Sequence, residues 1–505
     1  MSAPVSTTPT PAPEASQPSA PGSNRSIIAI LLVGAFIVIL NETTMNVALS
    51  QIMGDFGVTE RSAQWLTTAF MLTMAIVIPI TGWMLERFPT RVVFTLAMGL
   101  FSAGTAIAAI APTFAILLGG RVVQATGTAM MMPLLMTTIM HLVPPHGRGQ
   151  MMGNISMVIA VAPATGPTLS GVLLQLGSWR YIFAFVLPIA IAILVLGRLK
   201  LRNANEPRPV PLDGWSIPLT IIAFGPLIYG LSLIGDTTIP FWEPMLAIGI
   251  GIGGLIGFAA RQFVLQSQDR AFLDLRTFTH GTFTVALMMM AIGMMALFGT
   301  IIMLPLLLQR VYGLEPLQVG LMMLPGGIAM GVMGPLIGRL YDRVGPRPLV
   351  IPASVVVLAV FIGFSFLTPT TPWWLVMVGH MTMSTSFAFI FTPLFTVALG
   401  SLPKRLYSHG SALIGTIQQV AGAAGTALFV TVFAMQSDAA AAAGAGAAQA
   451  MLEGAHWAFL GAGAVWTAAV ISSIFLRRPT ETDADAVTGD QAHPGASDDT
   501  PMLTH

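Results

Sequence analysis

The chain has 505 residues, of which 54% are hydrophobic and 9% are charged, and its mean hydropathy is +0.79. Because ordinary soluble domains carry about 25% charged residues, this composition excludes a soluble globular protein and indicates a polytopic membrane protein. The net charge of +1 gives no basis for nucleic-acid binding. The sequence contains no cysteine, which excludes disulfides, thiol catalysis and cysteine-ligated metals.

The two ends of the chain differ from the rest in composition. Residues 1–24 are rich in Pro, Ser, Ala and Thr, and residues 479–505 are acidic and rich in Gly and Ala. Neither segment has enough large apolar side chains to form a core, so both are predicted to be disordered cytoplasmic tails. A cleavable signal peptide is not expected, because the first apolar segment is about 22 residues long and follows a single basic residue, Arg25.

Between the tails, apolar stretches of about 20 residues, each long enough to cross a bilayer as a helix, recur fourteen times. The predicted spans are 27–48, 62–85, 92–112, 114–140, 151–176, 180–198, 215–235, 243–265, 281–308, 316–339, 348–367, 373–398, 409–434 and 455–476. With the N-terminus inside, 18 of the 22 basic residues fall at cytoplasmic ends; the others are Arg61, Arg180 and Arg310 outside and Arg121 within a span. Since cytoplasmic loops carry an excess of Lys and Arg, this pattern predicts an all-α protein of the cytoplasmic membrane with both termini cytoplasmic.

The first and fourth predicted helices each contain one charged residue well inside the span, Glu42 and Arg121. A charge at the centre of a membrane helix costs about 2.5 to 3.5 kcal/mol on an insertion scale, so a function or a partner is expected for each. The helical rise places Glu42 about 22 Å from the cytoplasmic side and Arg121 about 10 Å from the other side of a core of about 30 Å. The two residues are therefore predicted to lie at a similar depth, where they either serve a common function or form an ion pair that only holds the helices together.

Two similar sequences lie at the ends of the second and tenth predicted helices and continue into the loops after them. PITGWMLERFPTR (79–91) and PLIGRLYDRVGPR (335–347) share Pro, Gly, an acid and two Arg at identical spacing. An acid at a helix end beside arginines can make a charge-assisted contact with a neighbouring helix. Repetition favours a conformational latch over charges that only set topology. The predicted latch residues are Gly82, Glu86, Arg87, Arg91, Gly338, Asp342, Arg343 and Arg347.

The fifth predicted helix contains the sequence APATGPTLSG, residues 162–171. Pro163 and Pro167 interrupt helical hydrogen bonding, while Gly166 and Gly171 permit close approach of another helix. This combination predicts a bend and a tight seal that controls access from one side. Ordinary packing through small residues is the alternative.

The spacing of the repeats predicts the domain organisation. The first pair is offset by 256 residues, and a second pair, 161–169 and 420–428, is offset by 259 residues, which is more than six helices need. The additional residues in these offsets match two predicted helices inserted between the two halves of the chain. The predicted units are a tail at 1–24, a six-helix half at 25–200, linkers with two inserted helices at 201–278, a second six-helix half at 279–478 and a tail at 479–505. Two halves around a midplane site are the plan of a secondary transporter.

Further polar residues inside the spans are candidates for a substrate cavity. His380 lies nearly at the repeat-equivalent position of Arg121, and histidine is the side chain that most readily titrates near neutral pH. The predicted cavity residues are Asn41, Asn46, Gln124, His380, Gln418 and Gln419. Hydrogen bonds between helices are an equally good explanation of the same residues.

Several of these motifs together resemble a known family. GWMLERFPTR resembles the loop between helices 2 and 3 of the major facilitator superfamily, with Glu86 at its usual Asp and Pro89 at its usual Gly. RVVQATG (121–127) resembles the fourth-helix motif of proton-coupled members, and APATGPTLSG resembles the fifth-helix motif of antiporters. LNETTMNVAL, SWRYIF and PLDGW resemble sequences of its fourteen-helix drug:proton antiporter branch, the QacA/EmrB-like multidrug efflux transporters. The resemblance covers residues 27 to 476 and implies the major facilitator fold.

The resemblance and the intramembrane charges together predict a proton-coupled antiporter that exports hydrophobic or amphipathic compounds by alternating access, as in multidrug efflux. Burial favours a proton on Glu42, whereas a nearby lipophilic cation favours the carboxylate, so proton and cargo would compete with Arg121 tuning the competition. The acid usual in the family aligns with Asn41, and Glu42 lies about 100° of helix to the side. The sequence leaves open which of the two faces the cavity.

The expected partners are small-molecule substrates, protons and the lipid bilayer, without nucleic acid, cofactor or metal; a periplasmic adaptor cannot be read from the sequence. A dedicated exporter of one metabolite, lipid or antibiotic is the alternative function. A non-transporting sensor or scaffold is disfavoured by the repeated latch motifs and by Glu42. An enzyme is not expected. The sequence contains no phosphate-binding GxxxxGK[ST] motif, which argues against ATP-driven transport by this chain.

Overall fold

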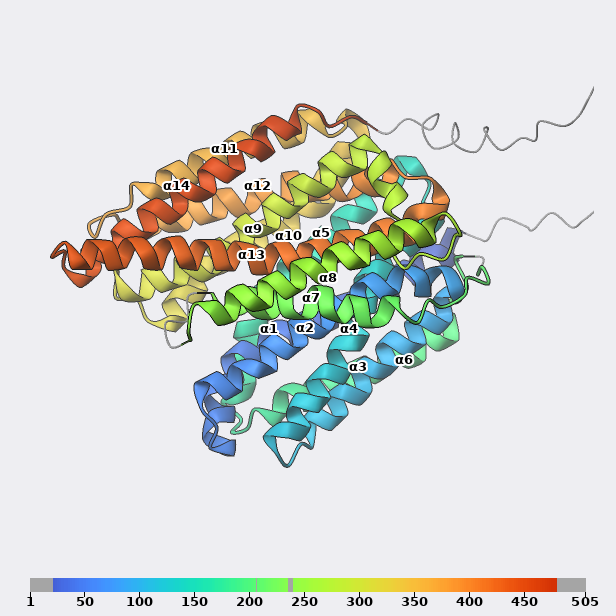
Figure 1. Ribbon diagram of the computed structural model, residues 1–505, viewed down its shortest axis with the longest axis horizontal. Coiled ribbons are helices and arrows are strands. Elements are labelled where there is room, and N and C mark those ends of the chain that lie inside the picture. Colours follow the sequence, from blue (N-terminus) through green and yellow to red (C-terminus); the bar gives the residue numbers. More distant parts are fainter. Residues whose placement is uncertain (1–20, 206, 235–238, 479–505) are drawn as a thin grey trace, which may run out of the picture.

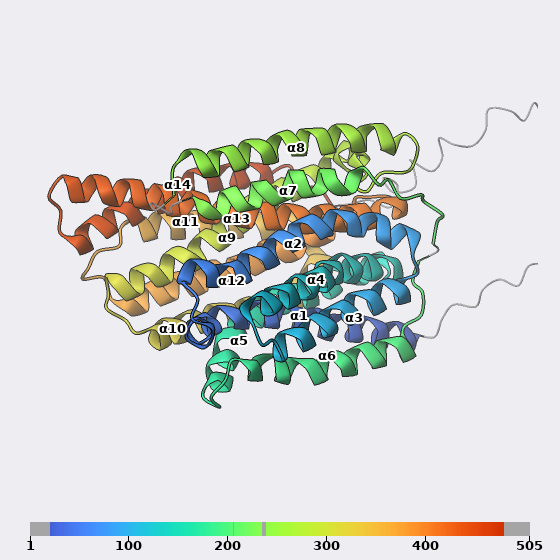
Figure 2. The same ribbon diagram turned by 60° about the horizontal axis from the view of Figure 1, so that its bottom comes forward.

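The computed structural model describes residues 21–205, 207–234 and 239–478 (Figure 1, Figure 2), and these residues form helices and loops without any strand. The elements in chain order are α1 (Pro21–Phe56), α2 (Glu60–Arg87), α3 (Thr90–Ala109), α4 (Phe114–Leu142), η1 (Pro145–Gly147), α5 (Arg148–Leu174), α6 (Arg180–Lys200), α7 (Ser216–Leu233), α8 (Trp242–Gln266), η2 (Leu275–Thr279), α9 (Gly281–Arg310), α10 (Pro316–Val344), α11 (Arg347–Ser365), α12 (Trp373–Gly400), η3 (Lys404–Leu406), α13 (Tyr407–Ala442) and α14 (Ala447–Ser473).

The number of membrane-spanning helices is confirmed. Within the described residues, fourteen helices are long and apolar enough to cross a membrane, and each predicted span overlaps one of them. The boundaries differ at both ends of the chain. α1 begins at Pro21, inside the segment predicted as a tail, where proline is well suited to the first helical turn. Residues 1–20 and 479–505, also predicted as tails, lie outside the described residues.

The helices pack in two groups and an additional pair. Helices α1 to α6 contact one another, through pairs such as α3 with α4 and α1 with α5, and helices α9 to α14 do the same, through pairs such as α9 with α13 and α11 with α14. The pair α7 and α8 packs together, and α7 contacts both α2 and α13 (Figure 2). The α7–α8 pair therefore lies over the junction between the two groups.

Glycines bring the two groups together along α5 and α10. A Cβ on Gly334 of α10 would lie 2.6 Å from the carbonyl oxygen of Gly153 on α5, and Cβ atoms on Gly338 and Gly331 would collide with Gly149 and Val161. Contacts this close are possible only with small residues, as in other tightly packed membrane helices. This seam and the contacts of α13 with α2 and α4 join the groups.

Polar contacts between the groups concentrate at one end of the bundle. We call this the terminal end, because α1 begins there and α14 ends there. The Thr137 and Ser411 hydroxyls are 2.6 Å apart, and Thr392 donates to Ser156 at 2.8 Å. Toward the opposite end the ribbons of α1–α6 diverge from those of α13 and α14 (Figure 1). The two groups are thus joined most firmly at the terminal end.

Candidate functional site

Arg121 is the centre of a polar cluster buried among the first four helices. Its side chain is 1% exposed, and Nη1 donates to Asn41 Oδ1 at 3.2 Å and to Gln124 Oε1 at 2.6 Å. Gln124 Nε2 in turn donates to Thr105 Oγ1 at 2.7 Å. The guanidinium carbon of Arg121 lies 4.0 Å from the centroid of the Phe70 ring, a cation–π distance. We call these five residues the arginine cluster.

Local helix geometry explains how the arginine cluster forms. Arg121 and Gln124 are three residues apart on α4, so their side chains lie on one face. Thr105 reaches Gln124 because α3 and α4 approach closely at Gly104, where a Cβ would lie 2.6 Å from the carbonyl oxygen of Gly120. Asn41 enters from α1 and supplies the acceptor that faces Arg121. The sequence did not indicate Thr105 or Phe70, since neither belongs to a recognisable motif.

Glu42 lies beside the arginine cluster without direct contact to its arginine. Its side chain is half-buried, and among the described residues it forms no ion pair with Arg121. Each residue nevertheless lies within electrostatic range of the other's charge. The direct partner of Arg121 on α1 is Asn41, as the rotation of about 100° between consecutive helical residues requires. Of the two neighbours, the amide binds the arginine, and the carboxyl forms no ion pair with it.

The proline and glycine motif of α5 packs against the same part of α1. Pro163 and Pro167 both lie inside the helix. A Cβ on Gly166 would lie 2.9 Å from the Cβ of Thr43, the residue after Glu42, so the expected close approach is present here. At Gly171 it is absent, because a Cβ there would meet nothing within 4 Å. Gly171 is in the last turn of α5, beyond its contact with α1.

The remaining predicted cavity residues do not join the arginine cluster. His380 is 7% exposed, and its Nε2 lies 3.5 Å from Ser384 Oγ, one turn further along α12. Gln419 Nε2 approaches Met74 Sδ at 4.0 Å, between α13 and α2. Gln418 Nε2 has no hydrogen-bond partner among the described residues. The side chain of Asn46 lies outside the described part of the structure.

The first predicted latch joins α2 to α13 at the terminal end. Glu86 Oε2 lies 3.1 Å from His409 Nε2, and His409 Nδ1 lies 3.1 Å from the carbonyl oxygen of Phe272. Gly82 makes room for this contact, since a Cβ there would lie 2.8 Å from the same Phe272 oxygen. His409 was not predicted from the sequence, where its only signal is a lone histidine at the start of the thirteenth span.

The partners of His409 define its protonation. A backbone carbonyl can only accept, and an ionised carboxylate can only accept. With Glu86 ionised, His409 must therefore donate from both ring nitrogens, as an imidazolium does. The His409 side chain is 4% exposed and that of Glu86 is 18% exposed, so under this condition the contact is a charge-assisted hydrogen bond with limited access to water. Loss of that proton would remove the ionic component of the contact.

The second predicted latch uses a helix terminus instead of a histidine. The Asp342 carboxylate accepts from the backbone N–H groups of Gly149 at 3.0 Å and Gln150 at 3.1 Å, in the first turn of α5. An anion is favourable there because the first N–H groups of a helix are unpaired and the helix dipole is positive at that end. Both acids of the repeated motif thus connect the first group of helices to the second.

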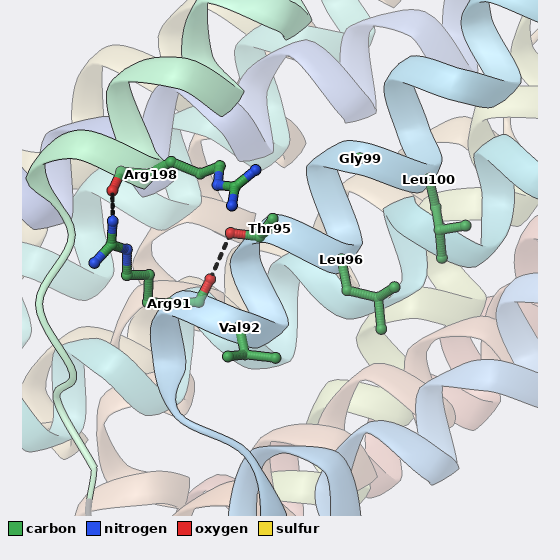
Figure 3. Close-up of a pocket in the computed structure, with 7 residues that line it drawn as sticks. All are labelled: Arg91, Val92, Thr95, Leu96, Gly99, Leu100 and Arg198. Atoms are coloured by element: carbon green, nitrogen blue, oxygen red, sulfur yellow. Dashed lines mark hydrogen bonds between the residues drawn. The ribbon is translucent and has the colours of Figure 1, made fainter.

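The arginines of the repeated motif have a different role. Arg91 donates to the carbonyl oxygen of Arg198 at the end of α6 (Figure 3), and Arg347 Nε donates to the carbonyl oxygen of Leu476, after α14, at 2.6 Å. Each therefore binds the end of the last helix in its own group, where a cation is favourable. Within the described residues neither Arg87 nor Arg343 forms an ion pair with a latch acid.

A chain of hydrogen bonds links the inserted helices to the first latch. Asp213 pairs with Arg261 at 2.6 Å and accepts from the Ser216 hydroxyl at 2.7 Å. Gln262 donates to the Ser216 hydroxyl at 2.9 Å and accepts from the Phe272 N–H at 2.7 Å. The Phe272 carbonyl then contacts His409. The hydrogen bond from Arg261 holds the pKa of Asp213 below its usual range.

The comparison with protein families decides the class of this helical bundle. Residues 31–426 match the family model of the Major Facilitator Superfamily. The chain belongs to the major facilitator superfamily. Members of the superfamily are membrane transporters of small molecules, so the protein is a multi-pass transporter and not an enzyme.

Bacterial relatives span most of the chain. It is 39% identical to the uncharacterized MFS-type transporter YcnB of Bacillus subtilis over 457 residues, which cover 90% of this chain and 96% of YcnB. It is 37% identical to the lincomycin resistance protein LmrB of Listeria monocytogenes, with 80% of this chain and 86% of LmrB covered. Identity to a multidrug resistance protein B homolog of Mycobacterium tuberculosis is 29%, with 86% of this chain and 81% of the homolog covered.

Solved structures of the superfamily share the fold. The human organic anion transporter MFSD10 matches with a TM-score of 0.66 and 15% identity, covering 90% of this chain and 100% of MFSD10. The proton:xylose symporter XylE matches with a TM-score of 0.62 and 16% identity, covering 92% and 99% of the two chains. At this level of identity the likeness concerns the fold alone.

Proposed function

We propose that this transporter is a proton-coupled antiporter that exports hydrophobic or amphipathic compounds across the cytoplasmic membrane of a bacterium by alternating access. The observation that carries the proposal is the arginine cluster beside Glu42. Asn41 and Gln124 hold Arg121 in a buried position, and an acid lies within electrostatic range of it. Charges at membrane depth are expensive and mark ion or substrate pathways in transporters.

In this mechanism Glu42 carries the proton, and the charge of Arg121 determines how readily Glu42 releases it. An occluded, desolvated Glu42 holds a proton, and Arg121 favours release of that proton when the cavity opens. A lipophilic cation within 4 Å of the carboxylate would gain up to about 4 kcal/mol at an effective dielectric of 20, but only after the proton has left. Proton and cargo therefore exclude each other, which couples their movements in opposite directions.

Alternating access requires two halves, and we assign these to α1–α6 and α9–α14, with α7 and α8 as an insertion. We place the terminal end in the cytoplasm, because most of the basic residues occur at that end. The Glu86–His409 and Asp342–α5 contacts then close the cytoplasmic side. Both contacts must break for cargo to enter from the cell.

Transport in proteoliposomes tests this function. Vesicles with an acidic lumen, containing the purified protein with its terminal end outside, are expected to accumulate a fluorescent lipophilic cation such as ethidium. Accumulation should disappear when a protonophore collapses the gradient, because protons leaving the lumen drive the cation inward. Accumulation of the cation at the same rate with and without the gradient would rule out antiport.

A dedicated exporter of one metabolite, lipid or antibiotic is the second candidate. It is favoured by the relatives of 37% to 38% identity, which are named for resistance to lincomycin. The same liposomes with a panel of unrelated cations, neutral lipophiles and a lincosamide separate the two functions. Several chemically unrelated substrates would establish the multidrug function, and a single substrate would establish the dedicated one.

A further inference from the structure

A recess of about 520 Å³ lies on the outer surface at the terminal end, between α3 and α6 (Figure 3). α3 packs on α4 and α6, on the far side of this group from the second group of helices. The recess is lined by Arg91, Val92, Thr95, Leu96, Gly99, Leu100 and Arg198.

The recess combines two cations with an apolar wall. The guanidinium groups of Arg91 and Arg198 lie at one end of it, while Leu96 and Leu100 extend along α3 at the other (Figure 3). Val92 is 49% exposed and Leu96 is 41% exposed, and no acid lines the recess. In a membrane-spanning bundle such apolar residues face acyl chains, and arginines at a helix end lie at the level of the lipid headgroups.

We propose that this recess binds an anionic phospholipid from the leaflet at the terminal end. The phosphate lies between the guanidinium groups of Arg91 and Arg198, whose planar donor sets match phosphate oxygens. One acyl chain lies along Leu96 and Leu100, in the space left at Gly99, where a Cβ would meet nothing within 4 Å. Arg91 already donates to the Arg198 carbonyl, which fixes its position and leaves its other N–H groups for the ligand.

The second half of the chain shows that helix capping does not explain this arrangement. Arg347 also binds a carbonyl at the end of its last helix, but the residue that supplies this carbonyl is Leu476, where the first half has Arg198. The position equivalent to Gly99 is Val355. Capping needs only the backbone of Arg198, so its guanidinium and the gap at Gly99 are features of a binding site particular to the first half.

Lipid retention by the full-length protein tests the proposal. Native mass spectrometry of the protein in detergent, titrated with phosphatidylglycerol or with phosphatidylcholine of the same acyl chains, measures each affinity. Phosphatidylglycerol is expected to bind more tightly. Arg198→Gln should weaken its binding about fivefold, the effect of one basic residue near a membrane surface, and Arg339→Gln, an exposed arginine on α10, should not.

A second variant tests the acyl-chain groove. Gly99→Phe fills the gap from a Cβ position that meets nothing within 4 Å and should lower phosphatidylglycerol retention, whereas Val355→Phe, at an exposed position of α11, should leave it unchanged. Equal retention of the two lipids by the unaltered protein would overturn the proposal. It would also be overturned if Arg198→Gln lowered phosphatidylglycerol binding no more than Arg339→Gln, or if Gly99→Phe lowered it no more than Val355→Phe. Competition by glycerol phosphate at the same concentration as whole lipid would also overturn it, since the site would then recognise a free phosphate ester. None of these readouts depends on transport, so the result is independent of the proposed antiport.

Discussion

Asn41 and Glu42 are neighbours in sequence but have different relations to Arg121. From the sequence, Glu42 and Arg121 were expected at a similar depth, and which of the two neighbours, Asn41 or Glu42, faces the cavity stayed open. In the structure Asn41 binds Arg121 at 3.2 Å and Glu42 remains outside hydrogen-bond range of it. In our account the amide holds the arginine and leaves the acid free to exchange its proton.

At this scale we predict the effect of removing the amide. Asn41→Ala would leave Arg121 Nη1 with one acceptor fewer inside the bundle. Loss of a hydrogen bond to a buried charged group costs about 1.5 to 3 kcal/mol, so the thermal unfolding midpoint in detergent should fall and cargo export should decrease. Ser232→Ala, an exposed position on α7, provides the control. An unfolding midpoint equal to that of the control would show that Asn41 does not support Arg121.

The sequence predicted part of the arginine cluster. Asn41, Arg121 and Gln124 were recognisable because polar residues are rare in apolar spans. Thr105 and Phe70 were not, since threonine and phenylalanine are common in membrane helices and only the packing of α2 and α3 on α4 brings them to Arg121. His409 was missed for a similar reason: its partner Glu86 is 323 residues away in the chain.

Among the elements, the ends of α2 and α10 carry the two acids that, in our proposal, hold the terminal end closed. Glu86 reaches α13 and Asp342 reaches α5, so the repeated motif supplies two contacts between the groups. The sequence predicted these acids as latches from their repetition. It did not predict that Arg91 and Arg347 bind helix ends in their own groups, because the ends they bind are more than a hundred residues away.

We predict that the double variant Glu86→Gln, Asp342→Asn shifts the population toward an open terminal end. Because the sequence contains no cysteine, spin labels can be placed selectively at Leu199→Cys and Lys404→Cys, which are both exposed. Double electron–electron resonance spectroscopy should show longer distances between the two spin labels in the double variant. Asp269→Asn serves as the control, since this side chain is 78% exposed and lies in the linker. Identical distance distributions in the double variant and the control would contradict a latch role.

The link between α7 and α8 gives a prediction about pH. The pKa of Asp213 is lowered by Arg261, so the pair stabilises the folded state above the ordinary carboxyl pKa of about 3.9, and this stabilisation is lost as pH falls below it. Because Arg261 is 37% exposed, solvent screening weakens this contribution.

Thermal unfolding measured from pH 7 to pH 3 tests this link. Asp213→Asn should unfold at a lower temperature than the unaltered protein at pH 7, and the difference should shrink toward pH 3. A difference that does not change with pH would indicate that the ionised carboxylate is not what stabilises the pair.

For the whole molecule, the sequence predicted the number of spans and the family. Apolar runs and the alternation of basic residues were sufficient for the fourteen helices, because each span must satisfy its own backbone hydrogen bonds in lipid. The positions of the helices relative to one another were not predictable in the same way. The packing of α7 against α2 and α13, and the glycine seam between α5 and α10, depend on contacts between distant parts of the chain.

In the proposed mechanism, Glu42 is the residue that couples cargo movement to protons. Proteoliposomes with a pH indicator in the lumen measure this coupling directly, because entry of cargo should release lumenal protons and raise the lumenal pH. We predict that Glu42→Gln still exchanges labelled cargo for unlabelled cargo but no longer changes the lumenal pH, while Glu453→Gln, near the start of α14, behaves like the unaltered protein. A full change of lumenal pH during cargo entry by the Glu42→Gln protein would contradict the account.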